Sequence, residues 1–285
     1  MKTIKAFIKV HPLLSYFAIV FAISWGGILI VVGPGVFLAT KEISGMLFVL
    51  VVLVALAGPS VAGILLTGLL DGRAGLSEFR SRLLKWRVGA RWYAVALLSA
   101  PLLFTAVLLA LSLISSEFLP GIFTTDDKAS ALLFGLVAGL MVGFFEELGW
   151  TGFAIPRMRL RYGILSTGLI VGLLWGAWHF PLISGSGTSS VALGLAIVLV
   201  RLFTWLPAYR VLMVWVYDRT GSLLIAILMH ASLSASMFIL TPVVIGVAIL
   251  AYILVRAAVL WIVVGAVAVA QGGHLSRVLL RRRVA

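Results

Sequence analysis

Eight long apolar runs constrain the fold of this chain more than any other feature of its sequence. A helix that crosses the ~30 Å hydrocarbon core of a bilayer needs about 20 apolar residues. Because 62% of the 285 residues are hydrophobic and only 11% are charged, a soluble globule of this length would lack adequate polar surface. We therefore predict an integral membrane protein, an all-α polytopic helical bundle with about eight transmembrane helices. The runs cover roughly residues 13–34, 45–70, 91–115, 131–155, 165–183, 190–217, 221–240 and 243–270.

The loops between these runs differ in charge, and this difference predicts the orientation of the bundle. Basic residues gather at both termini, after the second run and after the fourth run. They are Lys2, Lys5, Lys9, Arg73, Arg80, Arg82, Lys85, Arg87, Arg91, Arg157, Arg159, Arg161, Arg277 and Arg281 to Arg283. The alternate loops carry Glu117, Asp126 and Asp127, or the uncharged SGSGTSS of residues 184–190. Since Lys and Arg accumulate on the cytoplasmic side, we place the N and C termini in the cytoplasm.

The net charge of +13 fits this topology, because basic loops bind anionic lipid headgroups and need no nucleic-acid partner. The absence of cysteine excludes disulfides, cysteine catalysis and thiolate zinc sites. No linker interrupts the chain, so residues 1–285 are interpreted as a single integral membrane domain. The basic stretch 71–91 alternates Leu with Arg, which predicts an amphipathic helix on the cytoplasmic surface. A compact chain with a short basic amino terminus is typical of a bacterial plasma-membrane protein.

Six ionisable residues stand out deep inside the apolar runs. A charge at the bilayer centre costs roughly 2.5–3.5 kcal/mol, so each is a functional-site candidate by default. At 1.5 Å per residue, Glu146 and His230 lie ~14 Å, and His179 ~21 Å, from the expected cytoplasmic ends of their helices. Three helices thus bring one carboxylate and two imidazoles to a similar depth, which predicts one site. The six residues are Glu146, Glu147, His179, Arg201, His230 and Arg256.

Glu146 and Glu147 stand side by side near the end of the fourth run, in FFEELGWTGF. Neighbours on a helix point about 100° apart, so we expect one carboxylate to face a cavity and the other a supporting partner. A low dielectric and a like charge both favour the neutral form of a carboxyl group. We therefore expect at least one of the two to be protonated unless a cation neutralises it. A purely structural pair is the alternative, although an uncharged polar side chain would form hydrogen bonds there at lower cost.

Two glycine stripes lead into these polar residues and indicate close helix packing. Such small-xxx-small spacing lets two backbones approach, and we expect the fourth and fifth runs to contact each other through it. The alternative is ordinary helix packing unrelated to a site. Near the site residues, Trp175 lies one turn before His179, and Ser234 lies one turn after His230. The stripes are Gly135, Gly139 and Gly143 in the fourth run, and Gly168, Gly172 and Gly176 in the fifth.

The stretches EELGWT, WGAWH and HASLS together resemble the CAAX protease and bacteriocin-processing (CPBP, or Abi) family of intramembrane glutamic endopeptidases. That family has a Glu-Glu pair with an arginine four residues after the second Glu. An aromatic residue four before a histidine follows, and then a histidine with an asparagine four residues later. The order and intervals agree over residues 131–240, which the resemblance implies to be the catalytic core.

Two positions depart from the family pattern. Thr151 stands where the arginine is expected, and Ser234 where the asparagine is expected. The missing arginine leaves Glu147 without its counter-ion, and Arg201 in the sixth run is the substitute that we consider. Ser234 still offers a hydroxyl donor, but it forms fewer hydrogen bonds than a carboxamide.

The resemblance implies hydrolysis of peptide bonds by a glutamate-activated water. Glu146 would be the general base, and His179 would help to hold the water. His230 and Ser234 would polarise the scissile carbonyl and stabilise the oxyanion. The supporting residues would be Glu147, Thr151, Trp175 and Arg201. Prenylated carboxy-terminal peptides belong to eukaryotic branches of the family, so for this chain we expect leader peptides or membrane-protein tails as substrates.

Two other functions stay open on the sequence. The departures at Thr151 and Ser234 favour a non-catalytic family member that acts as a peptide-binding or bacteriocin-immunity membrane protein. A proton-coupled transporter would use glutamates and histidines as a relay, but the chain lacks duplicated halves with matching broken helices. Two histidines and a carboxylate also match a catalytic zinc ligand set. Because the H-E-x-x-H spacing is missing, we expect no cofactor and keep zinc as the alternative.

Overall fold

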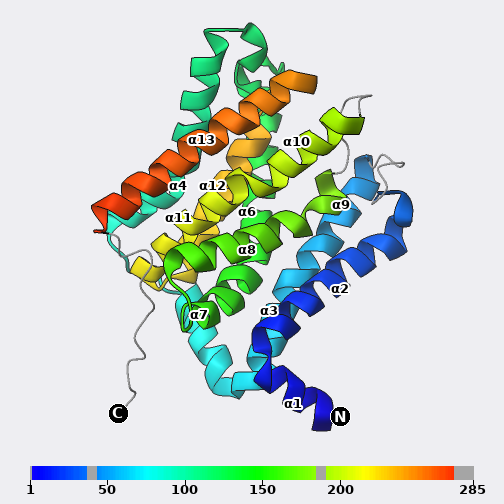
Figure 1. Ribbon diagram of the computed structural model, residues 1–285, viewed down its shortest axis with the longest axis vertical. Helices are drawn as coiled ribbons and strands as arrows, with labels where there is room; N and C mark the ends of the chain where they lie inside the picture. Colours follow the sequence, from blue (N-terminus) through cyan, green and yellow to red (C-terminus); the bar gives the residue numbers. More distant parts are fainter. Residues whose placement is uncertain (1, 37–43, 184–190, 273–285) are drawn as a thin grey trace.

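The computed structural model describes residues 2–36, 44–183 and 191–272, and within these residues the chain is helical with no strand. Figure 1 shows the helices packed side by side as a bundle, with α1 and α7 toward one end and α9 toward the other. The described helices are α1 (Lys2–Val10), α2 (Pro12–Val32), η1 (Pro34–Val36), α3 (Gly45–Leu83), α4 (Ala90–Ser112), η2 (Ser116–Phe118), α5 (Gly121–Thr124), α6 (Lys128–Gly149), η3 (Trp150–Ala154), α7 (Ile155–Met158), α8 (Ile164–Trp178), α9 (Phe180–Ile183), α10 (Val191–Phe203), α11 (Trp205–Thr220), α12 (Leu223–Leu240) and α13 (Gly246–Ala270).

Seven stretches of the described chain are long and apolar enough to cross a membrane. They are α2, α3, α4, the continuous segment from α6 to α7, the segment from α10 to α11, α12 and α13. The fifth predicted run forms α8, an apolar helix of only 15 residues, followed by the short α9. The prediction of an all-α polytopic membrane bundle is therefore confirmed. The SGSGTSS loop and the basic carboxy-terminal tail, on which part of the orientation rests, lie outside the described residues.

The basic stretch after the second run is helical as far as Leu83, and a kink at Gly72 separates it from the apolar part of α3. Gly72 interrupts the helix with φ of 63°, a left-handed conformation that glycine adopts without steric cost. Beyond this break, Phe79 is buried in a small apolar cluster with Leu148 and Leu223. The amphipathic segment therefore packs its apolar side against the base of α6 and α12.

The glycine stripe of α6 packs against α12, not against the fifth run as predicted. A Cβ atom added to Gly143 would lie 2.6 Å from the backbone nitrogen of Ala231, and one added to Gly139 would lie 2.7 Å from the Ala231 carbonyl oxygen. Such distances are shorter than any real Cβ contact, so only glycine permits this approach. Glu147 lies one turn beyond Gly143, and His230 directly precedes Ala231. The close approach thus brings these two side chains together.

The second stripe, on α8, packs against α11. A Cβ atom added to Gly168 would lie 2.5 Å from the Cα atom of Val211, and one added to Gly172 would lie 2.5 Å from the Cα atom of Pro207. The predicted pairing was wrong because a small-residue stripe permits close approach but does not say which helix approaches. Each stripe nevertheless brings one predicted site helix next to a helix that completes the site.

Candidate active site

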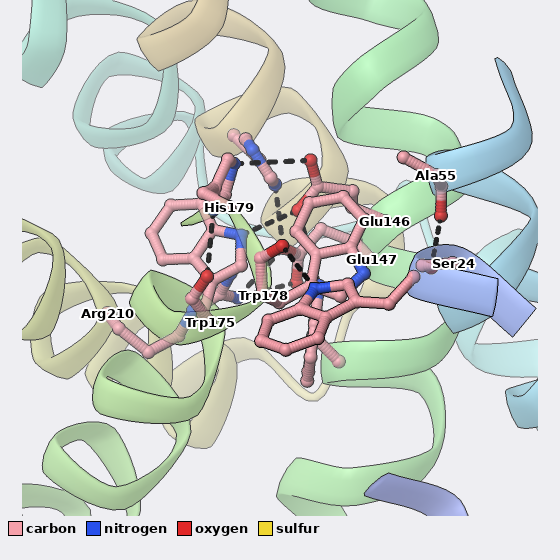
Figure 2. A network of polar contacts seen from close by, with 11 residues as sticks. Ser24, Ala55, Glu146, Glu147, Trp175, Trp178, His179 and Arg210 are labelled. Atoms are coloured by element: carbon pink, nitrogen blue, oxygen red, sulfur yellow. Dashed lines mark hydrogen bonds and ion pairs between the residues drawn. The ribbon is translucent and has the colours of Figure 1, made fainter. Parts of the chain in front are cut away.

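The two adjacent glutamates lie at the end of α6, and both side chains are buried. The helix then widens into the π-helical turn η3, a local distortion that is frequent at functional sites. The side chain of Trp150 reaches back to Glu146, and that of Thr151 reaches back to Glu147, each from four residues further along. The two carboxylates consequently have separate surroundings, as their angular separation on the helix predicts (Figure 2).

Glu147 is surrounded by hydrogen-bond donors from three other positions. Arg210 Nη1 lies 2.8 Å from Glu147 Oε1 and 3.0 Å from Oε2, and His230 Nδ1 lies 2.7 Å from Oε1. The hydroxyl of Thr151 donates to Oε2. Both members of the Arg210–Glu147 ion pair are fully buried, with 0% of either side chain exposed. Because a cation neutralises this carboxylate, Glu147 is positioned as an ionised, fully engaged group.

Arg210, rather than Arg201, supplies the counter-ion of Glu147, which corrects the expectation for Arg201. Arg210 projects from α11, and its guanidinium stacks on the ring of Trp175, 4.1 Å from the ring centroid. The close packing of Gly172 on Pro207 brings α8 and α11 together one turn before these two side chains. Sequence reasoning missed Arg210 because it lies only seven residues before the expected end of its run, where a long cationic side chain normally reaches the interface. The sequence feature that could have led to Arg210 is the Glu146–Glu147 pair without the arginine of the family pattern, because a buried carboxylate needs another cation.

Glu146 has fewer direct partners, and they hold one side of its carboxylate. Trp175 Nε1 donates to Oε2 at 2.6 Å, and Trp150 Nε1 donates to the same oxygen at 3.2 Å. The other oxygen, Oε1, lies 4.0 Å from His179 Nε2, which is too long for a direct hydrogen bond. Glu146 is thus oriented by two indoles, while Oε1 stays available.

The two ring nitrogens of His179 have different roles. Nδ1 lies 2.8 Å from the carbonyl oxygen of Trp175, and a carbonyl oxygen only accepts, so Nδ1 carries the proton in this contact. In the neutral ring Nε2 is then an acceptor that faces Oε1 of Glu146. A water molecule that bonded both atoms would donate one hydrogen to each.

A cavity of about 820 Å³ of empty space adjoins Glu146. Most of its wall is apolar, and Ala55 and Leu56 of α3 lie opposite the site helices. In Figure 2, Ala55 and the nearby Ser24 lie beside the glutamates, joined by a hydrogen bond of 2.6 Å that ties α2 to α3. The polar and aromatic lining includes Glu146, Trp175, Trp178, His179, Arg201, His230 and Ser234.

The four residues predicted to be catalytic all line this cavity, namely Glu146, His179, His230 and Ser234. Among the supporting residues, Trp175 and Arg201 also line it, whereas Glu147 and Thr151 lie behind the wall in the Arg210 network. Ser234 is 7% exposed, one turn beyond His230. In the described part of the chain, no group of three or more His, Cys, Asp and Glu side chains is arranged to hold a metal ion.

Comparison with known proteins finds a family that this core resembles. The sequence model of the type II CAAX prenyl endopeptidase Rce1-like family matches residues 128–236, from the start of α6 into α12. The core of the chain is therefore similar to this family. The Rce1-like segment contains both glutamates, both histidines, Arg210 and Ser234, and the resemblance inferred from the three short motifs is confirmed.

A curated relative supports the same conclusion. CAAX prenyl protease 2 of Methanococcus maripaludis is 26% identical to this chain over 155 residues. The match covers 52% of this chain and 56% of that protein, so the chain spans about half the length of its relative. The two comparisons and the long apolar helices agree with an integral membrane protein whose core is similar to the CAAX prenyl endopeptidases.

Proposed function

We propose that the protein is an intramembrane endopeptidase that hydrolyses peptide bonds with a water molecule activated by Glu146. The observation that carries this proposal is the arrangement of the Glu146 carboxylate: two indoles fix Oε2, and Oε1 faces His179 across 4.0 Å. Among the cavity-lining residues that the structure describes, Glu146 is the only carboxylate. A general base needs this combination of fixed orientation and one free oxygen.

The proposed reaction follows from the positions of these groups. Glu146 Oε1 accepts a proton from the water while the water oxygen attacks the carbonyl carbon of the scissile bond. The carbonyl oxygen becomes an oxyanion, and donors aimed at that atom lower the barrier. Glu146 then passes the proton to the leaving nitrogen as the C–N bond breaks.

His230 and Ser234 are the proposed oxyanion donors. Glu147 accepts the hydrogen bond of His230 Nδ1, so Nε2 is the ring nitrogen that can meet the substrate. When His230 is protonated, Nε2 donates to the oxyanion, and the hydroxyl of Ser234 donates from one turn further along α12. Glu147 and Arg210 hold the imidazole in place from behind.

The proposed substrates are peptides or membrane-protein segments that reach the site through lipid. A second cavity, with about 1210 Å³ of empty space, lies between α3 and α6. It shares Val52, Leu56 and Val142 with the first cavity, and most of its lining residues are apolar. Such a groove would admit the apolar part of a substrate, including a lipid-modified one, while the peptide bond reaches Glu146.

A non-catalytic peptide-binding or immunity protein is the second candidate, favoured by Ser234 in place of a carboxamide. Both candidates are tested with purified protein in nanodiscs, a pool of apolar and prenylated peptides, and mass spectrometry of the products. The protease predicts products from the wild type and none from Glu146→Gln, with or without a zinc chelator. Loss of cleavage on chelation would assign the chemistry to a metal, and no cleavage by folded wild type would favour the binding protein.

A further inference from the structure

The side chains of α1 divide by chemistry into two opposite sides of the helix. At about 100° per residue, Ile4 and Phe7 lie about 60° apart and form an apolar side. Lys5 and Lys9 lie about 40° apart, roughly 150° around the helix from the apolar side. Ile8, at the edge of the apolar side, packs against the core of the bundle. An apolar side opposite a basic one is typical of a helix that lies in the surface of a membrane.

The apolar side of α1 is largely uncovered in the bundle. Ile4 is 67% exposed and Phe7 is 50% exposed. The ring of Phe7 contacts that of His11, with centroids 4.9 Å apart, but half of Phe7 stays exposed. Apolar surface that stays in water forgoes roughly 25 cal/mol for every Å². The two side chains are therefore more stable in an apolar environment than in water.

The connection to α2 places α1 at the edge of the membrane. Only His11 separates α1 from α2, which is long and apolar enough to cross a bilayer. His11 leaves the helical conformation, with φ of −122° and ψ of 58°, and Pro12 begins the next helix. Consequently α1 turns away from the direction of α2 instead of extending it into water, as Figure 1 shows.

The end of the bundle that holds α1 is basic. Figure 1 shows α1 at the same end as α7 and the last part of α3. The exposed basic side chains of α1, of α3 beyond Gly72 and of the turn after α7 include Lys5, Lys9, Arg73, Arg80 and Arg161. The two acidic residues of this part of α3, Asp71 and Glu78, already pair with Arg157 and Arg82. This end therefore presents an excess of positive charge, which is complementary to anionic lipid headgroups.

We propose that α1 is an interfacial anchor that binds a bilayer containing anionic phospholipid. Ile4 and Phe7 insert among the acyl chains, and Lys5 and Lys9 lie at the level of the headgroup phosphates. A second copy of the chain is a poorer occupant of this surface, because it would bring like charges together. The inference goes beyond the proposed function and does not depend on it.

The test uses the fact that the sequence contains no cysteine, so one introduced cysteine can carry a nitroxide label by itself. The label is placed by Ile4→Cys on the apolar side or by Ala6→Cys, about 160° around the helix, in nanodiscs of phosphatidylcholine and phosphatidylglycerol. Power saturation compares collisions with oxygen, which partitions among acyl chains, and with a water-soluble nickel chelate. We expect the oxygen-to-nickel ratio to be severalfold higher at Ile4 than at Ala6. If Ile4→Cys does not fold, Phe7→Cys provides a second label on the apolar side.

The lysines are tested with the label kept at Ile4. Lys5→Gln and Lys9→Gln should each lower the ratio of inserted to released α1 about fivefold, as the loss of one basic contact with an anionic surface implies. Lys128→Gln, which is exposed at the start of α6 and the opposite end of the bundle, should leave that ratio unchanged. Omitting phosphatidylglycerol should lower it in the wild type.

Three results would overturn the proposal. Equal oxygen-to-nickel ratios at Ile4 and Ala6 would show that α1 does not lie in the membrane surface. An inserted fraction that is indifferent to both lysines and to phosphatidylglycerol would show that anionic lipid is not its partner. Spin–spin broadening that disappears on dilution with unlabelled protein would assign the apolar side to a second copy of the chain. Because none of these measurements involves cleavage, they leave the proposed function to its own test.

Discussion

Glu146 and Glu147 are chemically identical neighbours on one helix, yet their carboxylates have opposite surroundings in the bundle. Glu147 is closed in by Arg210, His230 and Thr151, and its charge is fully compensated. Glu146 is held at one oxygen only and presents the other to a cavity. The difference teaches that burial alone does not identify a catalytic carboxylate. What distinguishes the candidate base is a free oxygen on a fixed side chain.

The largest expected effect is the loss of turnover in Glu146→Gln. The amide keeps the shape of the side chain but cannot accept the proton of the water, so kcat should fall about 10²–10⁴-fold. The free energy of unfolding should change by less than about 1 kcal/mol, since the ion pair that Glu146 forms in the described chain is only the long 4.0 Å contact with His179. Peptide cleavage and thermal unfolding in detergent measure the two quantities, with the exposed Glu78→Gln as control. Full activity in Glu146→Gln would remove the distinction between the two glutamates.

The second largest effect is expected from breaking the buried ion pair between Glu147 and Arg210. Arg210→Met leaves Glu147 buried without its counter-ion, and removing one partner of a buried ion pair costs about 3–5 kcal/mol. Arg219→Met, on the exposed side of the same helix, is the matched control and should cost less than about 1 kcal/mol. Denaturant titration of both variants measures the difference. Equal stability of the two would show that Glu147 does not depend on Arg210.

The sequence predicted which polar residues line the cavity better than it predicted the contacts and helix pairings that hold them in place. The motifs named Glu146, His179, His230 and Ser234, which all line one cavity, because intramembrane polar residues are rare and their spacing is visible. Arg210 was missed, since nothing local to LPAYRVLMVW shows that this arginine turns inward to a carboxylate 63 positions away. The length of the apolar runs was enough to predict that the chain forms a bundle of membrane-spanning helices. The helix that packs against each glycine stripe could not be predicted in this way, because it depends on the packing of the whole bundle.

A smaller effect is expected at Gly143, where helix packing sets the position of Glu147. Gly143→Ala forces its Cβ against the backbone of Ala231, and such overpacking costs about 1–3 kcal/mol. The shift of α6 relative to α12 should also lower turnover, because it separates Glu147 from His230. Gly26→Ala is the control, since a Cβ atom there meets no neighbour within 4 Å. Unchanged stability in Gly143→Ala would mean that the two helices can separate freely.

The smallest effect concerns a third carboxylate, Asp127, which caps the other end of α6. It is exposed and accepts a hydrogen bond from the backbone N–H of Ser130 at 3.0 Å, and hydrogen bonding to Ser130 lowers the pKa of Asp127. A lowered folded-state pKa means that this contribution to stability is complete above the unfolded pKa of ~3.9 and is lost as pH falls through the folded value. Thermal unfolding between about pH 5 and pH 2 should therefore show a slightly steeper acid loss for wild type than for Asp127→Asn. An identical pH profile would show that the cap contributes nothing, whereas a large difference would mean that this exposed carboxylate is as closely coupled to the fold as Glu147.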